Sequence, residues 1–207
     1  MSLWAVLPVK PLEKGKSRLH DCMEAEELCR LNRFLFEETF QKLRSCGSID
    51  HVLVVSQDEN VLEYTRQSGG VALQENLLSS LNSAVTQALN HILEIDPGEV
   101  LIVPADLPWM TCEDLEDLLE LRQDGKFMVI VPDWHQWGTN AILISHPDLF
   151  TPQFGRHSFQ KHCRQAANQS LELVVWLNNN IQRDLDTPQD LITYNNVKII
   201  STQKMTK

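Results

Sequence analysis

The chain has 207 residues, of which 43% are hydrophobic and 22% are charged, as in an ordinary folded protein with one sizeable core. Its formal net charge of −10 argues against a nucleic-acid backbone or an anionic membrane as the main partner. The five cysteines form no CxxC pair, and the apolar N-terminal run stops at Pro8, too early for a signal core or a membrane span. We therefore expect one cytoplasmic domain over residues 1–207.

Short apolar segments alternate with segments of helical periodicity along the chain. We predict strands at residues 3–8, 51–56, 71–74, 99–106, 127–133, 140–145 and 171–177. We predict helices at residues 24–45, 58–67, 79–93, 111–122 and about 157–168, with a last helix from Pro188. Such alternation predicts an α/β fold with a mostly parallel sheet that helices cover on both faces. Open sheets of this kind bind ligands beyond the carboxyl ends of their strands.

The loop after the first predicted strand is basic. Its sequence is "LPVKPLEKGKSRL" (residues 7–19), and its basic residues are Lys10, Lys14, Lys16 and Arg18. Such a loop at a strand end can bind phosphates through ammonium groups and backbone N–H donors, although a solvated basic loop without a ligand is an equal alternative. Because neither GxGxxG nor GxxxxGK[ST] occurs, a Rossmann dinucleotide site and a P-loop are both disfavoured.

Three aspartates lie in two further loops. Asp106 stands in "PADLP" at the end of a strong strand, while Asp184 and Asp186 stand in "DLDTPQDL", just before a helix start at Thr187 and Pro188. Residues two apart in an extended segment point the same way, and two like charges side by side are unfavourable without a cation. Carboxylates from two strand ends are suitable ligands for Mg²⁺. For a single aspartate, a turn or capping role is the alternative.

A third region carries glycines and hydroxyls. It comprises "WGTNAIL" (137–143) and "FGRHSFQKH" (154–162), with Gly138 and Gly155 at positions that suggest special dihedrals or close backbone approach. Thr139 and Ser158 supply hydroxyls. Ser158 at a helix start either caps the helix or lies where the N–H groups of the helix bind an anion.

These motifs together resemble a known family. In chain order, "LPVKPLEKGKSRL", "PADLP", "GTNA", "FGxxSFxxH" and "DLDTPQDL" look like the guanylyltransferases that activate 2-phospho-L-lactate or phosphoenolpyruvate in coenzyme F-420 biosynthesis. The "DxDTPxDL" ending is shared with wider relatives, such as molybdenum-cofactor guanylyltransferases, whereas "GTNA" with "FGxxSFxxH" is more specific. The resemblance covers nearly the whole chain. It implies a single-domain, three-layer, Rossmann-like nucleotidyltransferase fold.

The resemblance also implies a role for individual residues. The acids expected to hold Mg²⁺ are Asp106, Asp184 and Asp186. The residues expected to bind the carboxylate of the phospho-acid are Thr139, Gly155 and Ser158. The nucleotide is expected to contact Lys16, Arg18, the backbone of Leu7, Pro8, Val9 and Lys10, and, near the base or ribose, Asn82. Of these, Lys16 and the three aspartates are the expected catalytic residues. The chain departs from the family pattern at Ser80, Trp134 and Trp137, which affects the expected guanine selection and acceptor pocket.

The implied reaction is Mg²⁺-dependent transfer of GMP from GTP to a small phosphorylated carboxylic acid, with release of pyrophosphate. Two alternatives stay open: an acceptor such as a molybdopterin cofactor or a sugar phosphate, and a GTP-binding protein without catalysis. The sequence does not choose between the phospho-acids, and base preference depends on the loop at residues 76–82. The apolar segments at 173–177 and 197–201 suit either an edge-to-edge homodimer or completion of the sheet.

Overall fold

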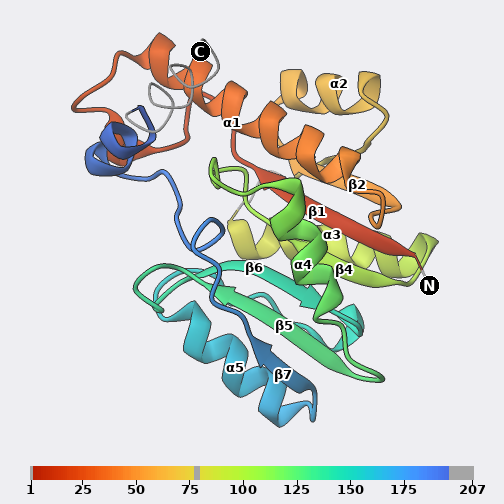
Figure 1. Ribbon diagram of the computed structural model, residues 1–207. Coiled ribbons are helices and arrows are strands. Elements are labelled where there is room, and N and C mark those ends of the chain that lie inside the picture. Colours follow the sequence, from red (N-terminus) through yellow and green to blue (C-terminus); the bar gives the residue numbers. More distant parts are fainter. Residues whose placement is uncertain (1, 77–79, 196–207) are drawn as a thin grey trace, which may run out of the picture.

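The computed structural model of the chain describes residues 2–76 and 80–195 (Figure 1). This part of the chain contains a seven-stranded sheet with the order β3-β2-β1-β4-β6-β5-β7. The strands are β1 (Leu3–Val9), β2 (His51–Ser56), β3 (Val71–Gln74), β4 (Glu99–Ile102), β5 (Phe127–Pro132), β6 (Thr139–Ile144) and β7 (Glu172–Val175). Neighbouring strands are parallel, except that β6 runs antiparallel to both β4 and β5. The predicted mostly parallel sheet is confirmed.

Helices connect the strands. They are α1 (Ala25–Ser45), α2 (Glu59–Gln67), α3 (Leu81–Ile95), α4 (Cys112–Glu120) and α5 (Ser158–Asn168), with short 3-10 turns at Ser17–Leu19 and Pro147–Leu149. Residues 188–195 are also helical, as predicted from Pro188. In the described residues no helix combines the length and apolar character needed to cross a membrane. The segment 197–201 lies outside the described residues, so its expected place at a sheet edge or dimer interface stays a prediction.

Alternating side chains of each strand build two hydrophobic cores. On β1, Leu3, Ala5 and Leu7 pack on one face, together with α1 and α4. Trp4 and Val6 pack on the opposite face, together with α3 and α5. In Figure 1 the sheet accordingly lies between helices, with α4 and α3 overlapping the same strands in the view. The predicted three-layer α/β domain is confirmed.

The strand β4 is shorter than predicted. The sequence suggested a strand over residues 99–106, whereas the observed strand ends at Ile102. The N–H of Val103 still donates to the carbonyl of Val6 (3.1 Å), but Pro104 has no N–H to extend the ladder. The chain therefore turns away from the sheet at this point, and Asp106 lies in a turn beyond the strand.

Candidate active site

A pocket of about 450 Å³ lies at the carboxyl ends of β1, β2, β3 and β4. The loop after β1 forms one wall, and residues of α1, the start of α3 and the turn after β4 form the others. The lining residues are Pro8, Val9, Lys10, Pro11, Leu12, Lys14, Gly15, Lys16, Asn32, Leu35, Gln57, Glu75, Ser80, Leu81, Ala84, Pro104, Ala105, Asp106 and Asp186. The predicted nucleotide-binding loop and two of the three predicted aspartates thus share one pocket.

An ammonium group lies between two carboxylates at one end of this pocket. The Nζ atom of Lys16 is 3.3 Å from Oδ2 of Asp106 and 3.4 Å from Oδ1 of Asp186. The Lys16 side chain is only 6% exposed, whereas the two aspartates are about one-third exposed. The guanidinium of Arg18 lies 3.6 Å from the other oxygen of Asp186 but is mostly exposed. Positive charge and two carboxylates therefore meet at the pocket wall.

The loop that carries Lys16 is held by a side chain of α1 and by Asp58, the N-cap of α2. The amide of Asn32 donates to the Leu12 carbonyl (2.7 Å), and the Leu12 N–H donates to Oδ2 of Asp58 (3.0 Å). A Cβ atom at Gly15 would lie 2.7 Å from the Asn32 amide nitrogen, so glycine permits this approach. Lys16 itself has a positive φ of 53°, a conformation that few non-glycine residues adopt. The loop is therefore shaped to turn this ammonium inward.

The turn that carries Asp106 is held from α1. The Thr39 hydroxyl donates to the Ala105 carbonyl (3.4 Å), and the Lys42 ammonium donates to the Pro108 carbonyl (3.3 Å). The backbone of Asp106 in turn accepts the N–H of Leu185 (3.0 Å). This last bond joins the two loops predicted to supply carboxylates and places Asp186 beside Asp106.

Asp184 lies close to the other two acids. Burial and, to a smaller extent, the negative charges of Asp106 and Asp186 together raise the pKa of Asp184 to about 6, against smaller opposing effects that include the charge of Lys16. The three predicted aspartates thus converge. However, Asp184 is not among the pocket-lining residues, and in residues 2–76 and 80–195 no group of three or more acidic, His or Cys side chains is arranged to hold a metal ion. Of the three predicted aspartates, Asp106 and Asp186 are the two that line the pocket.

A buried carboxylate anchors the segment that precedes Asp184. Asp114 accepts hydrogen bonds from the amides of Asn178 (2.7 Å) and Asn180 (2.9 Å) and from the N–H and hydroxyl of Thr111. Burial alone would raise the pKa of Asp114, but the hydrogen bonds from Asn178, Thr111 and Asn180 outweigh it and lower the pKa. The Asn178 side chain also accepts the N–H groups of Asn180 and Ile181 (both 2.9 Å). Asp114 therefore connects α4 to the segment that contains Asn178 and Asn180 and that leads to Asp184.

We expect Asp114→Ala to destabilise the fold and to impair the site. The change leaves the half-buried amides of Asn178 and Asn180 without their acceptor, which costs about 2–4 kcal/mol. Denaturant unfolding monitored by circular dichroism measures this loss. Glu113→Ala, an exposed acid on the same helix, is the matched control and is expected to change stability by less than about 0.5 kcal/mol. Equal stabilities of the two variants would contradict the anchoring role.

The predicted acceptor-binding hydroxyls form a buried cluster. The Ser158 hydroxyl donates to Oγ1 of Thr139 (3.1 Å), which also lies 3.1 Å from Nδ1 of His162. The N–H of Gln153 donates to Nε2 of His162 (3.0 Å), so the neutral ring carries its proton on Nδ1. Thr139 and Ser158 are thus brought together, but they are at most 9% exposed and do not line the pocket of about 450 Å³.

The start of α5 differs from the predicted capping arrangement. Ser158 is the first residue of the helix, and the N-cap is His157, which has a left-handed φ of 59° and makes no capping hydrogen bond with its side chain. The suggestion that Ser158 caps this helix is therefore wrong, because its hydroxyl binds Thr139 instead. Gly155 has a φ of +108°, which explains the glycine two residues before the cap.

We expect the buried His162 to make stability dependent on pH. Burial and, to a smaller extent, the nearby Lys161 charge together lower the pKa of His162 from 6.5 to about 4. Below pH 6.5 the unfolded chain takes up a proton at His162 that the folded chain does not, so stability present above pH 6.5 is lost as pH falls towards 4. The loss from this group reaches about 3 kcal/mol. Denaturant unfolding between pH 7 and pH 4.5 measures it, and an equally steep loss in His162→Gln would contradict it.

The remaining predicted residues lie around this cluster and the pocket. Both ends of the Asn82 amide bind the backbone of Phe154 (2.7 and 3.2 Å), so Asn82 holds the loop before Gly155, and its contact with the base or ribose stays a prediction. Ser80 lines the pocket and caps α3 by accepting the N–H of Ser83. Trp134 and Trp137 are 51% and 64% exposed.

The buried residues of the site carried weak sequence signals. Asp114 follows Thr111 by three positions, which indicates only a capping box, and its partners Asn178 and Asn180 are more than 60 positions away. His162 closes the "FGxxSFxxH" motif, so its presence was visible while its contacts were not. Glu75, which lines the pocket, lies in no sequence motif that would indicate a functional role.

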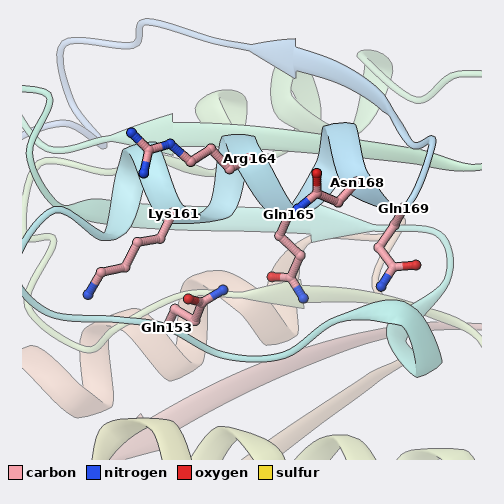
Figure 2. Close-up of a pocket in the computed structure, with 6 residues that line it drawn as sticks. All are labelled: Gln153, Lys161, Arg164, Gln165, Asn168 and Gln169. Carbon is pink, nitrogen blue, oxygen red and sulfur yellow. The ribbon is translucent and has the colours of Figure 1, made fainter.

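A second, smaller cavity of about 280 Å³ runs along α5 (Figure 2). It is lined by Gln153, Lys161, Arg164, Gln165, Asn168 and Gln169. Figure 2 shows Lys161 and Arg164 pointing away from one another, so their charges do not converge on a shared ligand. The Gln165 amide donates to the carbonyl of Leu149 (3.4 Å). The larger pocket is therefore the candidate active site.

Sequence comparison identifies relatives along almost the whole chain. The family model described as "Guanylyl transferase CofC like" matches residues 3–196. The phosphoenolpyruvate guanylyltransferase of Rubrobacter xylanophilus is 36% identical over 191 residues, covering 92% of both chains. The 2-phospho-L-lactate guanylyltransferase of Methanocaldococcus fervens is 28% identical over 186 residues, covering 90% of this chain and 81% of the relative.

Structural comparison supports the fold. A nucleotidyl transferase from Methanothermobacter superposes with a TM-score of 0.68 at 13% identity, covering 97% of this chain and 99% of the other. The CMP:2-keto-3-deoxy-manno-octonic acid synthetase, solved in complex with CTP, gives a TM-score of 0.64 at 13% identity, covering 99% of this chain and 100% of the other. At such identities the likeness concerns the fold alone.

Proposed function

The chain belongs to the CofC-like guanylyl transferase family, and from this premise we propose that it transfers GMP from GTP to 2-phospho-L-lactate or phosphoenolpyruvate with release of pyrophosphate. The observation that carries this proposal is the pocket of about 450 Å³ in which the Lys16 ammonium lies between Asp106 and Asp186. A basic loop and paired carboxylates suit a triphosphate whose phosphates must be both bound and neutralised.

The proposed reaction needs no nucleophile from the protein. An ionised phosphate oxygen of the acceptor forms a bond to the α-phosphorus of GTP, while the bond from that phosphorus to the bridging oxygen breaks and pyrophosphate leaves with the electron pair. The difficulty is repulsion between anions, because two unit charges 4 Å apart repel by about 4 kcal/mol at an effective dielectric constant near 20. Lys16, with its ammonium at the pocket wall, offsets this repulsion and stabilises charge on the departing pyrophosphate.

Asp106 and Asp186 are the residues proposed to hold Mg²⁺. Both line the pocket and are partly exposed, and after burial their negative charges are the next causes of the raised pKa of neighbouring Asp184. Two carboxylates are a suitable protein contribution for Mg²⁺, which takes its other ligands from substrate phosphates and water. When bound, the ion would neutralise phosphate charge during the transfer. Asp184 then acts behind these two residues and contributes to the negative potential.

The acceptor is proposed to bind near Thr139, Gly155 and Ser158. There is open space beside Gly155, since a Cβ at this position would meet nothing within 4 Å. The first N–H groups of α5, those of Ser158 and Phe159, donate to the carbonyls of Gly155 and Trp137, so what favours a carboxylate here is the positive end of the helix dipole. Transfer of GMP to either acid would make a guanosine diphospho-acid, and we propose that this product serves coenzyme F-420 biosynthesis.

Incubation with GTP, Mg²⁺ and each acid, followed by mass analysis of the products, tests the proposal. We expect pyrophosphate and a guanosine diphospho-acid with at least one of the two acids. If product forms only with a molybdopterin cofactor or a sugar phosphate, the proposed phospho-acid acceptor is wrong and that compound is the acceptor instead. GTP binding in calorimetry without pyrophosphate release from any acceptor would overturn the enzymatic proposal.

A further inference from the structure

A buried acid lines the candidate pocket far from the paired aspartates. Glu75 directly follows β3, is 9% exposed and lines the same pocket as Asp106. In the sheet order β3-β2-β1-β4, three strand spacings separate the ends of β3 and β4. At about 4.8 Å for each spacing, these strand ends are roughly 14 Å apart, so Glu75 and Asp106 line the pocket from different strands of the sheet edge. The reaction chemistry proposed above uses only the Asp106 end.

The sheet fixes the face on which Glu75 lies. Its N–H donates to the carbonyl of Ser56 (2.8 Å), which continues the parallel pairing of β3 with β2 beyond Gln74. Side chains alternate along a strand, so Glu75 shares a face with Val71 and Leu73, which pack towards α3. By the same alternation Gln57, which follows β2 and also lines the pocket, lies next to Glu75 on that face.

This face meets the start of α3 within the pocket. Ser80, Leu81 and Ala84 all line it, and Leu81 and Ala84 supply apolar surface. A flat, largely apolar ring fits such a wall, and a few convergent polar groups at its edge then determine which ring is accepted. With the phosphates held by the Lys16 end, the base of the nucleotide reaches the Glu75 end.

We infer that Glu75 reads the Watson–Crick edge of guanine and sets the base specificity of this site. The inference rests on the proposed function, because it takes GTP as the ligand. An ionised carboxylate only accepts hydrogen bonds and offers about four acceptor positions. Guanine presents two adjacent donors there, N1–H and the 2-amino group, whereas adenine presents a lone pair at N1 that the carboxylate repels. The Gln57 amide donates one hydrogen to the Asn76 carbonyl (3.2 Å), and the inference assigns its second hydrogen to O6 of guanine.

Binding of GTP, ITP, ATP and XTP to Glu75→Gln, measured by calorimetry, tests the inference. We expect the affinity for GTP to fall about 10- to 100-fold, the effect of losing hydrogen bonds to a buried charge. The wild-type preference for GTP over ITP, which lacks the 2-amino group, should shrink. XTP should bind the variant better than it binds the wild type, because the new amide donates to the 2-oxo group of xanthine. If Glu75 had only a structural role, the substitution would not change the affinities for GTP and XTP in opposite directions.

Glu94→Gln is the matched control, since it removes the same charge from an exposed position on α3. It should keep the wild-type order of affinities. Wild-type protein that binds GTP and XTP equally, or a Glu75→Gln variant with an unchanged ratio of GTP to XTP affinity, would overturn the inference. Because affinity is measured without an acceptor, GTP-selective binding without turnover would refute the proposed reaction while leaving the role of Glu75 supported.

Discussion

Asp186→Asn is expected to lower turnover by about 1000-fold or more while leaving the fold intact. The substitution keeps the shape of the side chain but removes the charge that faces the Lys16 ammonium at 3.4 Å and Arg18 at 3.6 Å. It also removes one of the two pocket-facing carboxylates proposed to hold Mg²⁺. Loss of a preorganised electrostatic group at a reacting phosphate is typically worth about 3–4 kcal/mol, or about two to three powers of ten in rate, and loss of the ion adds to it.

The rate of pyrophosphate release over a range of Mg²⁺ concentrations measures this effect. Higher Mg²⁺ should restore part of the lost rate if the variant mainly weakens binding of the ion. Asp117→Asn, an exposed acid on α4, is the control and should retain wild-type turnover. Turnover of Asp186→Asn within about threefold of the wild type would rule out a role for this carboxylate in catalysis.

The fold was predictable because its signals are local. Each strand of the sheet carries an apolar run, and each helix carries a periodic apolar face, so the alternation is visible within windows of about ten residues. The end of β4 was placed too late because "LIVPA" is apolar throughout, although Pro104 cannot donate to the ladder. The antiparallel direction of β6 was not predicted, since strand direction depends on long-range packing rather than local pattern.

The convergence of the three aspartates was also predictable. Asp106 follows a parallel strand, and such strand ends share one edge of the sheet, where a ligand binds. The sequence pattern did not show that the Lys16 ammonium lies between Asp106 and Asp186. The position of the Lys16 ammonium depends on its left-handed backbone and on Asn32 and Asp58, which hold the loop from two different helices. The spacing of charged residues along the sequence does not show how this loop folds or where its ammonium group lies.

Other functional groups were hidden for a related reason. Thr139 and Ser158 were expected to face a ligand, yet their hydroxyls bind one another and His162. Glu75 follows an ordinary short strand, and only the strand order shows that it lies across the pocket from Asp106. These arrangements are set by tertiary contacts between residues far apart in the chain, so one sequence alone does not reveal them.

Lys16→Met is expected to lower turnover by about 100- to 1000-fold and at the same time to tighten binding of Mg²⁺. The ammonium is nearly buried and lies 3.3 Å from Asp106 and 3.4 Å from Asp186. In the protein without substrate it therefore competes with a divalent ion for the same two carboxylates. Methionine has a similar length but no charge, so it leaves both carboxylates available, while the charge that would stabilise the departing pyrophosphate is lost.

Two measurements on the same variant separate these effects. Calorimetric titration with Mg²⁺ should show higher affinity for Lys16→Met than for the wild type, whereas pyrophosphate release should be slower at saturating Mg²⁺ and GTP. Lys16→Arg keeps the positive charge and should retain the weaker Mg²⁺ affinity, although its larger planar group will still slow turnover. Lys14→Met removes a neighbouring, more exposed charge and serves as the control for a general effect of loop charge. If Lys16→Met binds Mg²⁺ no better than Lys14→Met does, the Lys16 ammonium does not compete with the ion. Asp106 and Asp186 are then not the residues that bind Mg²⁺.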